Sequence, residues 1–142
     1  MLCVDVNVLV YAHRPESPEH AHFKAWLEEH RRAHEPIGLL DQVCSGFVRV
    51  VTHPRIFKEP TPLAEALGFV RALRSSPAVT TVKPGDRHWS IFAELCTASD
   101  ARANLVPDAF LAAAALEQGA TWVTADRGFA RFGGLRLLHP LD

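Results

Sequence analysis

The stretch LVPDAFLAAAALEQGATWVTAD, residues 105–126, joins a helix pattern directly to a strand pattern. Pro107 fits the first helical position and Gly119 the C-terminal stop, and the alanines between them predict a central helix buried on nearly all sides. The β-branched residues that follow predict a strand at Thr121–Thr124. This alternation of helix and strand is typical of an α/β fold.

The alternation extends along the whole chain, which predicts an α/β sandwich with a mainly parallel central sheet. We expect strands at Leu2–Asp5, Ile37–Leu40, Val79–Val82, Thr121–Thr124 and near Leu135–Leu138. We expect further helices from about Pro18 to before Pro36, from an Asp41 cap to His53, from Thr61–Pro62 to Ser75, and from an Asp86 cap.

Two of these helices have a predicted inward face. Spacing at helical period assigns to the core Leu63, Leu67, Val70 and Leu73 of one helix, and Trp89, Phe92, Ala93 and Cys96 of the other. The stripe of Trp26, Trp89 and neighbouring phenylalanines is interpreted as core.

Length and composition indicate one globular domain, residues 1–142. The chain has 48% hydrophobic and 22% charged residues, which excludes a disordered, coiled-coil or collagen-like chain. Its net charge of −1 supplies no overall positive field for nucleic acid, so a phosphate ligand has to be held locally.

The three cysteines, Cys3, Cys44 and Cys96, include no C-x-x-C pair, which argues against a disulfide framework or a thiolate zinc site. The apolar opening residues contain Asp5 and follow no basic segment, and no apolar run is long enough to span a membrane. We therefore expect a cytoplasmic protein that contacts no membrane.

Three carboxylates follow strands or begin a helix in the predicted fold. Asp5 ends a strand, Asp108 lies in the first turn of a helix, and Asp126 lies just beyond the strand at 121–124. In an open parallel sheet these positions lie near one crevice, where ligands bind. Clustered carboxylates repel one another, so they need a cation, a shared proton or a partner. Their hard oxygens suit Mg²⁺ or Mn²⁺. Asn7 and Thr124 are candidate supporting residues.

Two of these acids also suit a purely structural role, since Asp108 fits a helix N-terminus and Asp126 a turn. A carboxylate in an apolar strand is costly without a partner, which favours a functional role for Asp5. The histidine pairs at 20/22 and 30/34 are interpreted as solvated surface residues. No P-loop, G-x-G-x-x-G or G-x-S-x-G motif is present.

The segments VDVNVLVYA, FVRVVTHPRIF, LVPDAFLAAAALEQGATWVTAD and DRGFARFGGLRLLHPL occur in an order that resembles PIN-domain ribonucleases of the VapC toxin type. The resemblance covers nearly the whole chain. It implies a three-layer α/β/α sandwich, a divalent-metal site, endonuclease action on RNA, a homodimer and inhibition by a VapB-type antitoxin. It also implies that Asp5, Asp108 and Asp126 are metal-binding catalytic acids, with Thr124 as the hydroxyl residue before the last acid.

The sequence departs from the family pattern at the second acid. The family usually has a Glu in the helix before the R-V-x-T stretch, whereas this chain reads CSGFVRVVT, with Ser45 and Gly46 at the expected place. We expect Gly46 to allow close packing or to leave room in the crevice. Asp41 or Glu94 is a candidate substitute acting through water.

The preferred hypothesis is hydrolysis of RNA phosphodiester bonds by water activated on Mg²⁺ or Mn²⁺. One alternative is a PIN-like module, weakened at the second acid, that binds RNA or protein without cutting. A more distant alternative is a phosphohydrolase of the haloacid-dehalogenase type, because Asp5-Val6-Asn7 resembles its D-x-D start.

Overall fold

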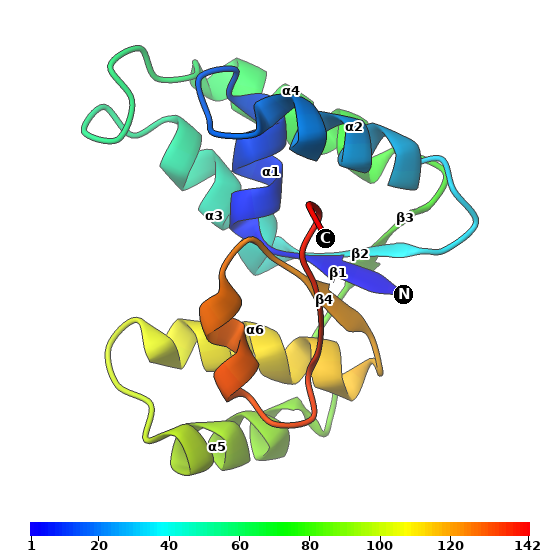
Figure 1. The fold of residues 1–142 in the computed structure, drawn as a ribbon, viewed down its shortest axis with the longest axis vertical. Helices are drawn as coiled ribbons and strands as arrows, with labels where there is room; N and C mark the ends of the chain where they lie inside the picture. Colours follow the sequence, from blue (N-terminus) through cyan, green and yellow to red (C-terminus); the bar gives the residue numbers. More distant parts are fainter.

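The computed structural model describes residues 1–142 and contains one five-stranded, fully parallel sheet in the order β3-β2-β1-β4-β5 (Figure 1). The expected parallel sheet is thereby confirmed. Its strands are β1 (Leu2–Val4), β2 (Ile37–Leu40), β3 (Val79–Val82), β4 (Thr121–Val123) and β5 (Arg136–Leu138).

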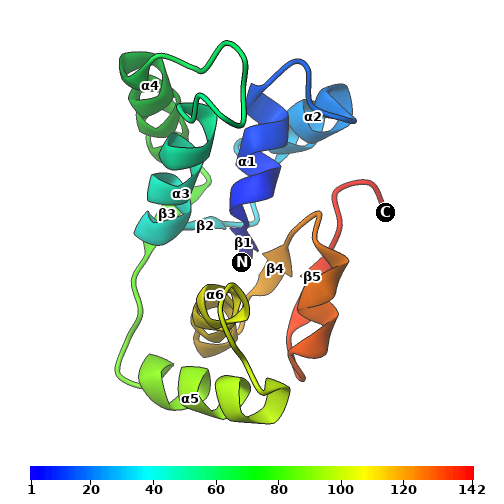
Figure 2. The ribbon, with the colours of Figure 1, turned by 90° about the vertical axis from the view of Figure 1, so that its left-hand side faces the viewer.

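Helices cover both faces of this sheet. Figure 2 shows α1 to α4 on one side and α5 and α6 on the other, which confirms the three-layer α/β/α sandwich. The helices are α1 (Val6–His13), α2 (His20–His30), α3 (Asp41–Val51), α4 (Leu63–Arg74), α5 (His88–Ser99) and α6 (Leu105–Glu117), and a 3₁₀ helix, η1, spans Arg127–Arg131.

The strand order sets the place of a binding crevice. The chain runs from β1 outward to β2 and β3, and then returns to the other side of β1 to form β4 and β5. The order therefore reverses at β1, and ligands of open parallel sheets bind beyond the carboxyl ends of the strands at such a point. Asp5 follows β1 directly, and its amide continues the strand pairing by donating to the Val123 carbonyl at 2.9 Å.

The core lies between the sheet and its helices. Trp122 of β4 is fully buried, and the alanines of α6 at positions 112–115 lie against the sheet with at most 1% of their surface exposed. The predicted burial of the alanine helix is confirmed. Pro107 is its third residue rather than its first, because the helix begins two residues earlier, at Leu105.

Helix α1 is absent from the sequence-based prediction. The strand ends at Val4 rather than at Asp5, and Asp5 caps the new helix by accepting a hydrogen bond from the Val6 amide at 2.7 Å. The helix packs against α2 and α3, and Val8, Leu9 and Val10 are all buried. Because apolar residues surround it on several sides, its sequence lacks the polar face that identifies an amphipathic helix.

The predicted inward faces of α4 and α5 are partly wrong. In α4, Leu63 and Leu67 are 60% and 45% exposed, whereas Val70 and Leu73 are buried as expected, together with Ala66. Both leucines were assigned to the core because they are apolar and fall at helical spacing. Only a narrow strip of α4 contacts neighbouring elements, and it does not include them.

Helix α5 buries His88 and Leu95, while Trp89 is 70% exposed. Phe92 and Cys96 are only half-buried and Ala93 is exposed, contrary to the prediction. The reason is that α5 packs mainly on α6, so it contacts one helix rather than the sheet and buries a narrow face.

The two predicted aspartate caps do not form. Asp41 lies inside the first turn of α3 and pairs with Arg74, with 2.9 Å between Oδ1 and Nη1. At the start of α5, the Glu117 carboxylate rather than Asp86 accepts the hydrogen bonds of nearby amides, from Gly85 at 2.7 Å and Arg87 at 3.0 Å. A long-range partner therefore engages Asp41, and a long-range carboxylate takes the place expected for Asp86.

No helix in the structure has both the length and the apolar character needed to cross a membrane.

We predict opposite effects of alanine at two glycines. A Cβ on Gly38 in β2 would lie 2.7 Å from Val82 Cγ2 and 2.8 Å from Cys3 Sγ, so Gly38→Ala should lower the free energy of unfolding by about 1–3 kcal/mol. Gly68 in α4 has open space at the same point, so Gly68→Ala should raise it by up to ~1 kcal/mol. Urea unfolding of both variants measures these changes, and a neutral Gly38→Ala would contradict the tight packing of β2.

Candidate active site

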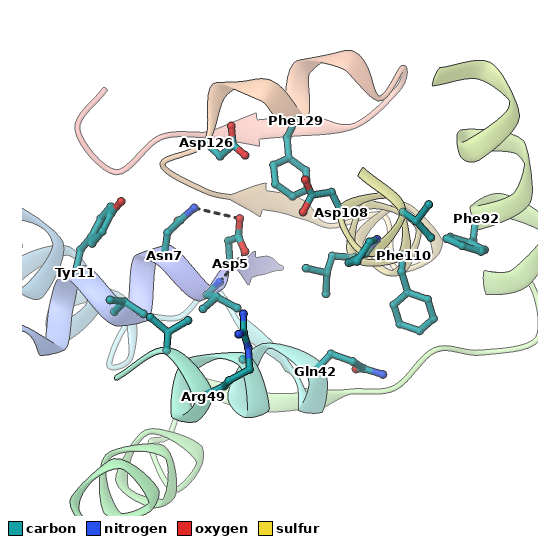
Figure 3. A pocket seen from close by; sticks show the side chains of 17 residues that line it. Asp5, Asn7, Tyr11, Gln42, Arg49, Phe92, Asp108, Phe110, Asp126 and Phe129 are labelled. Atoms are coloured by element: carbon teal, nitrogen blue, oxygen red, sulfur yellow. Dashed lines mark hydrogen bonds between the residues drawn. The ribbon is translucent and has the colours of Figure 1, made fainter. Parts of the chain in front are cut away.

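A cavity of about 760 Å³ opens at the carboxyl end of β1, where the strand order reverses. Asp5, Asp108 and Asp126 all line it, and Figure 3 shows their side chains converging from the residue after β1, from α6 and from the segment after β4. The structure thus brings together three acids that are far apart in the sequence. Their catalytic role remains a prediction.

Asp5 is the buried member of the three, with 6% of its surface exposed. Its Oδ1 accepts a hydrogen bond from the Val6 amide at 2.7 Å. Its Oδ2 accepts from the Thr124 hydroxyl at 2.7 Å and from the Asn7 amide nitrogen at 3.3 Å. Both oxygens are therefore oriented by neighbouring groups of α1 and the β4 end.

The two predicted supporting residues join the ends of β1 and β4. The Thr124 hydroxyl donates to Asp5 and accepts from the Asp126 amide at 3.0 Å. The Asn7 side chain donates to Thr124 Oγ1 at 3.2 Å and accepts from the Ala125 amide at 3.0 Å. This network fixes the spacing between Asp5 and the segment that carries Asp126, which is a positioning role.

Asp108 and Asp126 present freer carboxylates to the cavity. Asp126 caps η1, with Oδ1 accepting from the Gly128 amide at 2.8 Å, and no protein group donates to its Oδ2. Asp108 is half-buried in the first turn of α6 and accepts no hydrogen bond from the protein. These oxygens are available to a ligand, whereas those of Asp5 are already engaged.

The acids influence one another electrostatically. Burial raises the pKa of Asp5 to about 6, the hydrogen bonds from Thr124 and Val6 oppose the rise, and repulsion from Asp108 and Asp126 adds to it. Burial also raises the pKa of Asp108, repulsion from Asp126 adds to that rise, and the Arg131 guanidinium opposes it. The cavity thus concentrates negative charge in partly desolvated surroundings.

Helix α3 supplies the wall that lacks the second acid. A Cβ on Gly46 would lie 2.9 Å from Val6 Cγ2, so this glycine lets α3 pack closely against α1, as expected. Gln42 and Arg49 are the polar residues of α3 that line the cavity. The α3 wall is therefore neutral and cationic where the family usually has a carboxylate.

Neither candidate substitute for the second acid reaches this cavity. Asp41 pairs with Arg74 outside it, and Glu94 is exposed on α5. Both residues were suggested by their positions in the sequence, but position alone does not show in which direction a side chain points.

Aromatic residues of the cavity were missed by sequence analysis. Tyr11, Phe92, Phe110 and Phe129 all line it, although the pattern assigned phenylalanines to the core. No local signal distinguishes them, because aromatic residues at helical spacing look the same in sequence whether they fill the core or line a cavity.

The acids fit a hydrated divalent cation by their chemistry. No group of three or more His, Cys, Asp or Glu side chains in the structure is close enough together to hold a metal ion. Mg²⁺ retains several waters and is commonly bound by one or two carboxylates, which matches the free oxygens of Asp108 and Asp126. The donor set suits such an ion and offers no sulfur or imidazole for a softer one.

Known proteins resemble this chain along its full length. The family model of the PIN domain matches residues 2–135. Ribonuclease VapC43 of Mycobacterium tuberculosis is 54% identical over 142 residues, which cover 100% of this chain and 97% of that protein. Ribonuclease VapC25 of the same organism is 39% identical over 140 residues, which cover 99% of each chain.

Among solved structures, VapBC2 from Rickettsia felis, bound to a DNA fragment from its promoter, contains a chain with a TM-score of 0.73 to this one. That alignment covers 97% of each chain at 18% sequence identity and supports the fold alone. The family match and the full-length identity to named ribonucleases are the stronger findings, and they show that this chain belongs to the PIN-domain family and, within it, to the VapC ribonucleases.

Proposed function

We propose that this protein is a Mg²⁺- or Mn²⁺-dependent endoribonuclease toxin of a toxin-antitoxin pair. The observation that carries the proposal is the convergence of Asp5, Asp108 and Asp126 on one cavity at the reversal point of the sheet. The identity to ribonucleases VapC43 and VapC25 supports the reaction class.

Each acid has a distinct part in the proposed site. Asp108 and Asp126 hold the ion through their free oxygens, and Asp5 contributes charge and a fixed acceptor at the cavity floor. A bound Mg²⁺ or Mn²⁺ supplies an activated water and neutralises charge on the scissile phosphate. Asn7 and Thr124 keep the Asp5 carboxylate oriented toward this place.

Arg49 is the proposed phosphate-binding residue. It lines the cavity from α3, and Figure 3 shows its side chain extending toward the end of β1 where Asp5 lies. No carboxylate forms an ion pair with it, in contrast to Arg74 and Arg127, which pair with Asp41 and Asp142. A guanidinium facing a carboxylate cluster across a cavity suits an RNA phosphate that bridges the two.

The missing second acid lowers the negative charge of the site. With Gly46 packed on Val6, no side chain from that position enters the cavity. A divalent ion at this site would therefore have fewer protein ligands, and Asp5, Asp108 and Asp126 would have to hold it without a second acid from α3.

We further propose a VapB-type antitoxin partner, a homodimer and a cytoplasmic location. The Rickettsia felis structure is one of VapBC2, and this chain shares the fold of one of its chains. A cluster of carboxylates is a suitable receptor for an arginine of an inhibiting segment.

The central prediction concerns the acids. Asp5→Asn and Asp108→Asn should each lower the rate of Mg²⁺-dependent RNA cleavage by more than about 100-fold, since each removes a negative charge that favours binding of the ion. The matched control is Asp100→Asn, because Asp100 is exposed and adopts a left-handed conformation that asparagine tolerates. Cleavage of a labelled RNA at wild-type rate by either acid variant would refute the assignment, and an inactive wild-type protein would favour the binding-module alternative.

The second prediction concerns the ion. At neutral pH, Mg²⁺ or Mn²⁺ at 100 times its Kd should stabilise the native protein by about 2.7 kcal/mol, because an ion that binds only the native state shifts the folding equilibrium. The rise in Tm should disappear in Asp108→Asn. Differential scanning calorimetry with and without EDTA checks this, and an unchanged Tm at millimolar Mn²⁺ argues against a native ion site.

The third prediction concerns Arg49. Arg49→Ala should weaken RNA binding about equally for all sequences and reduce the slope of log Kd against log salt by about 1, as expected for loss of one phosphate contact. Arg32→Ala is the control, because Arg32 lies just after α2, away from the cavity, and is 74% exposed. An identical salt slope in wild type and Arg49→Ala would exclude the phosphate contact.

A further inference from the structure

A series of aromatic rings leads from the acidic cavity to the surface of α5. Phe110 and Phe92 line the cavity, and their ring centroids are 5.8 Å apart. Trp89, one turn before Phe92 on α5, continues the series at 5.2 Å, with an angle of 50° between the ring planes. Figure 3 shows Phe110 and Phe92 on the side of the cavity where α6 faces α5.

The outer end of this series is open to solvent. Trp89 is 70% exposed, whereas the other tryptophans are more enclosed: Trp122 is fully buried and Trp26 stacks on His30 at 4.0 Å. The Trp89 indole contacts Phe92 and leaves most of its surface free for a flat ligand.

The position of Trp89 is set by its neighbour in the chain. His88 is buried with 4% exposed, its Nε2 lies 2.9 Å from the Phe110 carbonyl oxygen, and its ring meets the Phe110 ring at 4.3 Å. The Glu117 carboxylate of α6 also holds the start of α5 through the Gly85 and Arg87 amides. The first turn of α5 is therefore anchored to the same helix that carries Asp108.

We propose that Trp89 is the stacking platform for an unpaired base of the RNA substrate, on the same strand as the nucleotide whose phosphate reaches the acids. This inference rests on the proposed ribonuclease function and names how its substrate is held. The chain has a net charge of −1, and its cavity is lined by three carboxylates, so phosphate attraction is limited. Stacking of bases on aromatic rings supplies affinity that does not depend on positive charge.

A second copy of this chain fits the α5 surface less well. Trp89 is the only large apolar residue of α5 that is exposed, and its exposed neighbours are Ser90, Ala93 and Glu94. An interface between copies needs a larger apolar centre of several side chains. One exposed ring continuous with the candidate active site suits a single base better.

The test measures binding of a short, labelled oligoriboadenylate by fluorescence anisotropy. EDTA is present, so that the RNA is not cleaved. Trp89→Ala should raise the Kd by about 5- to 150-fold, and Trp89→Phe should recover part of the loss because it restores a ring. Leu63→Ala is the control, since Leu63 is also largely exposed but lies on α4 outside the cavity. With Mg²⁺ present, Trp89→Ala should raise KM more than it lowers kcat.

Tryptophan emission gives a second readout. Oligoriboadenylate should quench the wild-type emission, an abasic oligomer of equal charge should not, and Trp89→Phe should lose the quenching.

An unchanged Kd in Trp89→Ala, equal binding of the abasic oligomer, or no binding by wild type overturns the inference. So does a shift of Trp89→Ala from dimer to monomer in sedimentation, which would assign the surface to contact between copies. Loss of cleavage in Asp5→Asn together with an unchanged Kd in Trp89→Ala would leave the proposed function intact.

Discussion

The buried carboxylate of Asp5 is the constraint on which the site depends. Burial raises its pKa to about 6 from the ordinary value of 3.8, so the unfolded chain releases this proton at lower pH than the folded one. Between these values the folded protein binds more protons, and its stability falls as pH rises, by about 3 kcal/mol once both states are ionised. The hydrogen bonds from Thr124 and Val6 keep this cost from being larger.

The same hydrogen bonds explain why the ends of β1 and β4 stay together. Thr124 links the Asp5 carboxylate to the Asp126 amide, and Asn7 links α1 to the Ala125 amide. A charged group that would destabilise an apolar strand thus becomes the centre of a polar network. The network leaves Asp108 and one oxygen of Asp126 free, so the protein's own groups orient one acid and leave the others to a ligand.

The cavity is asymmetric because its walls come from different elements. Acids line the side formed by β1, α6 and the segment after β4, whereas Gln42 and Arg49 line the α3 side. Gly46 allows α3 to pack against Val6, and this close packing leaves no room for a side chain at position 46. The glycine in CSGFVRVVT therefore removes a carboxylate from the cavity and also allows α3 to pack closely on Val6. The gap is visible in the sequence because the rest of this segment follows the family pattern.

The sequence by itself determined the parallel α/β class, the buried alanine helix and the three candidate acids, because strand and helix patterns and an acid in an apolar run are local properties. Only the tertiary structure decided that Val6–His13 is a helix, that Leu63, Leu67 and Trp89 face outward, and that Glu117 rather than Asp86 holds the start of α5. In each case residues distant in the chain determine burial and hydrogen bonding, and the local sequence does not show which distant residues will be neighbours. Phe92 and Phe110 line the same cavity as the acids for the same reason, because their positions depend on how α5 packs on α6.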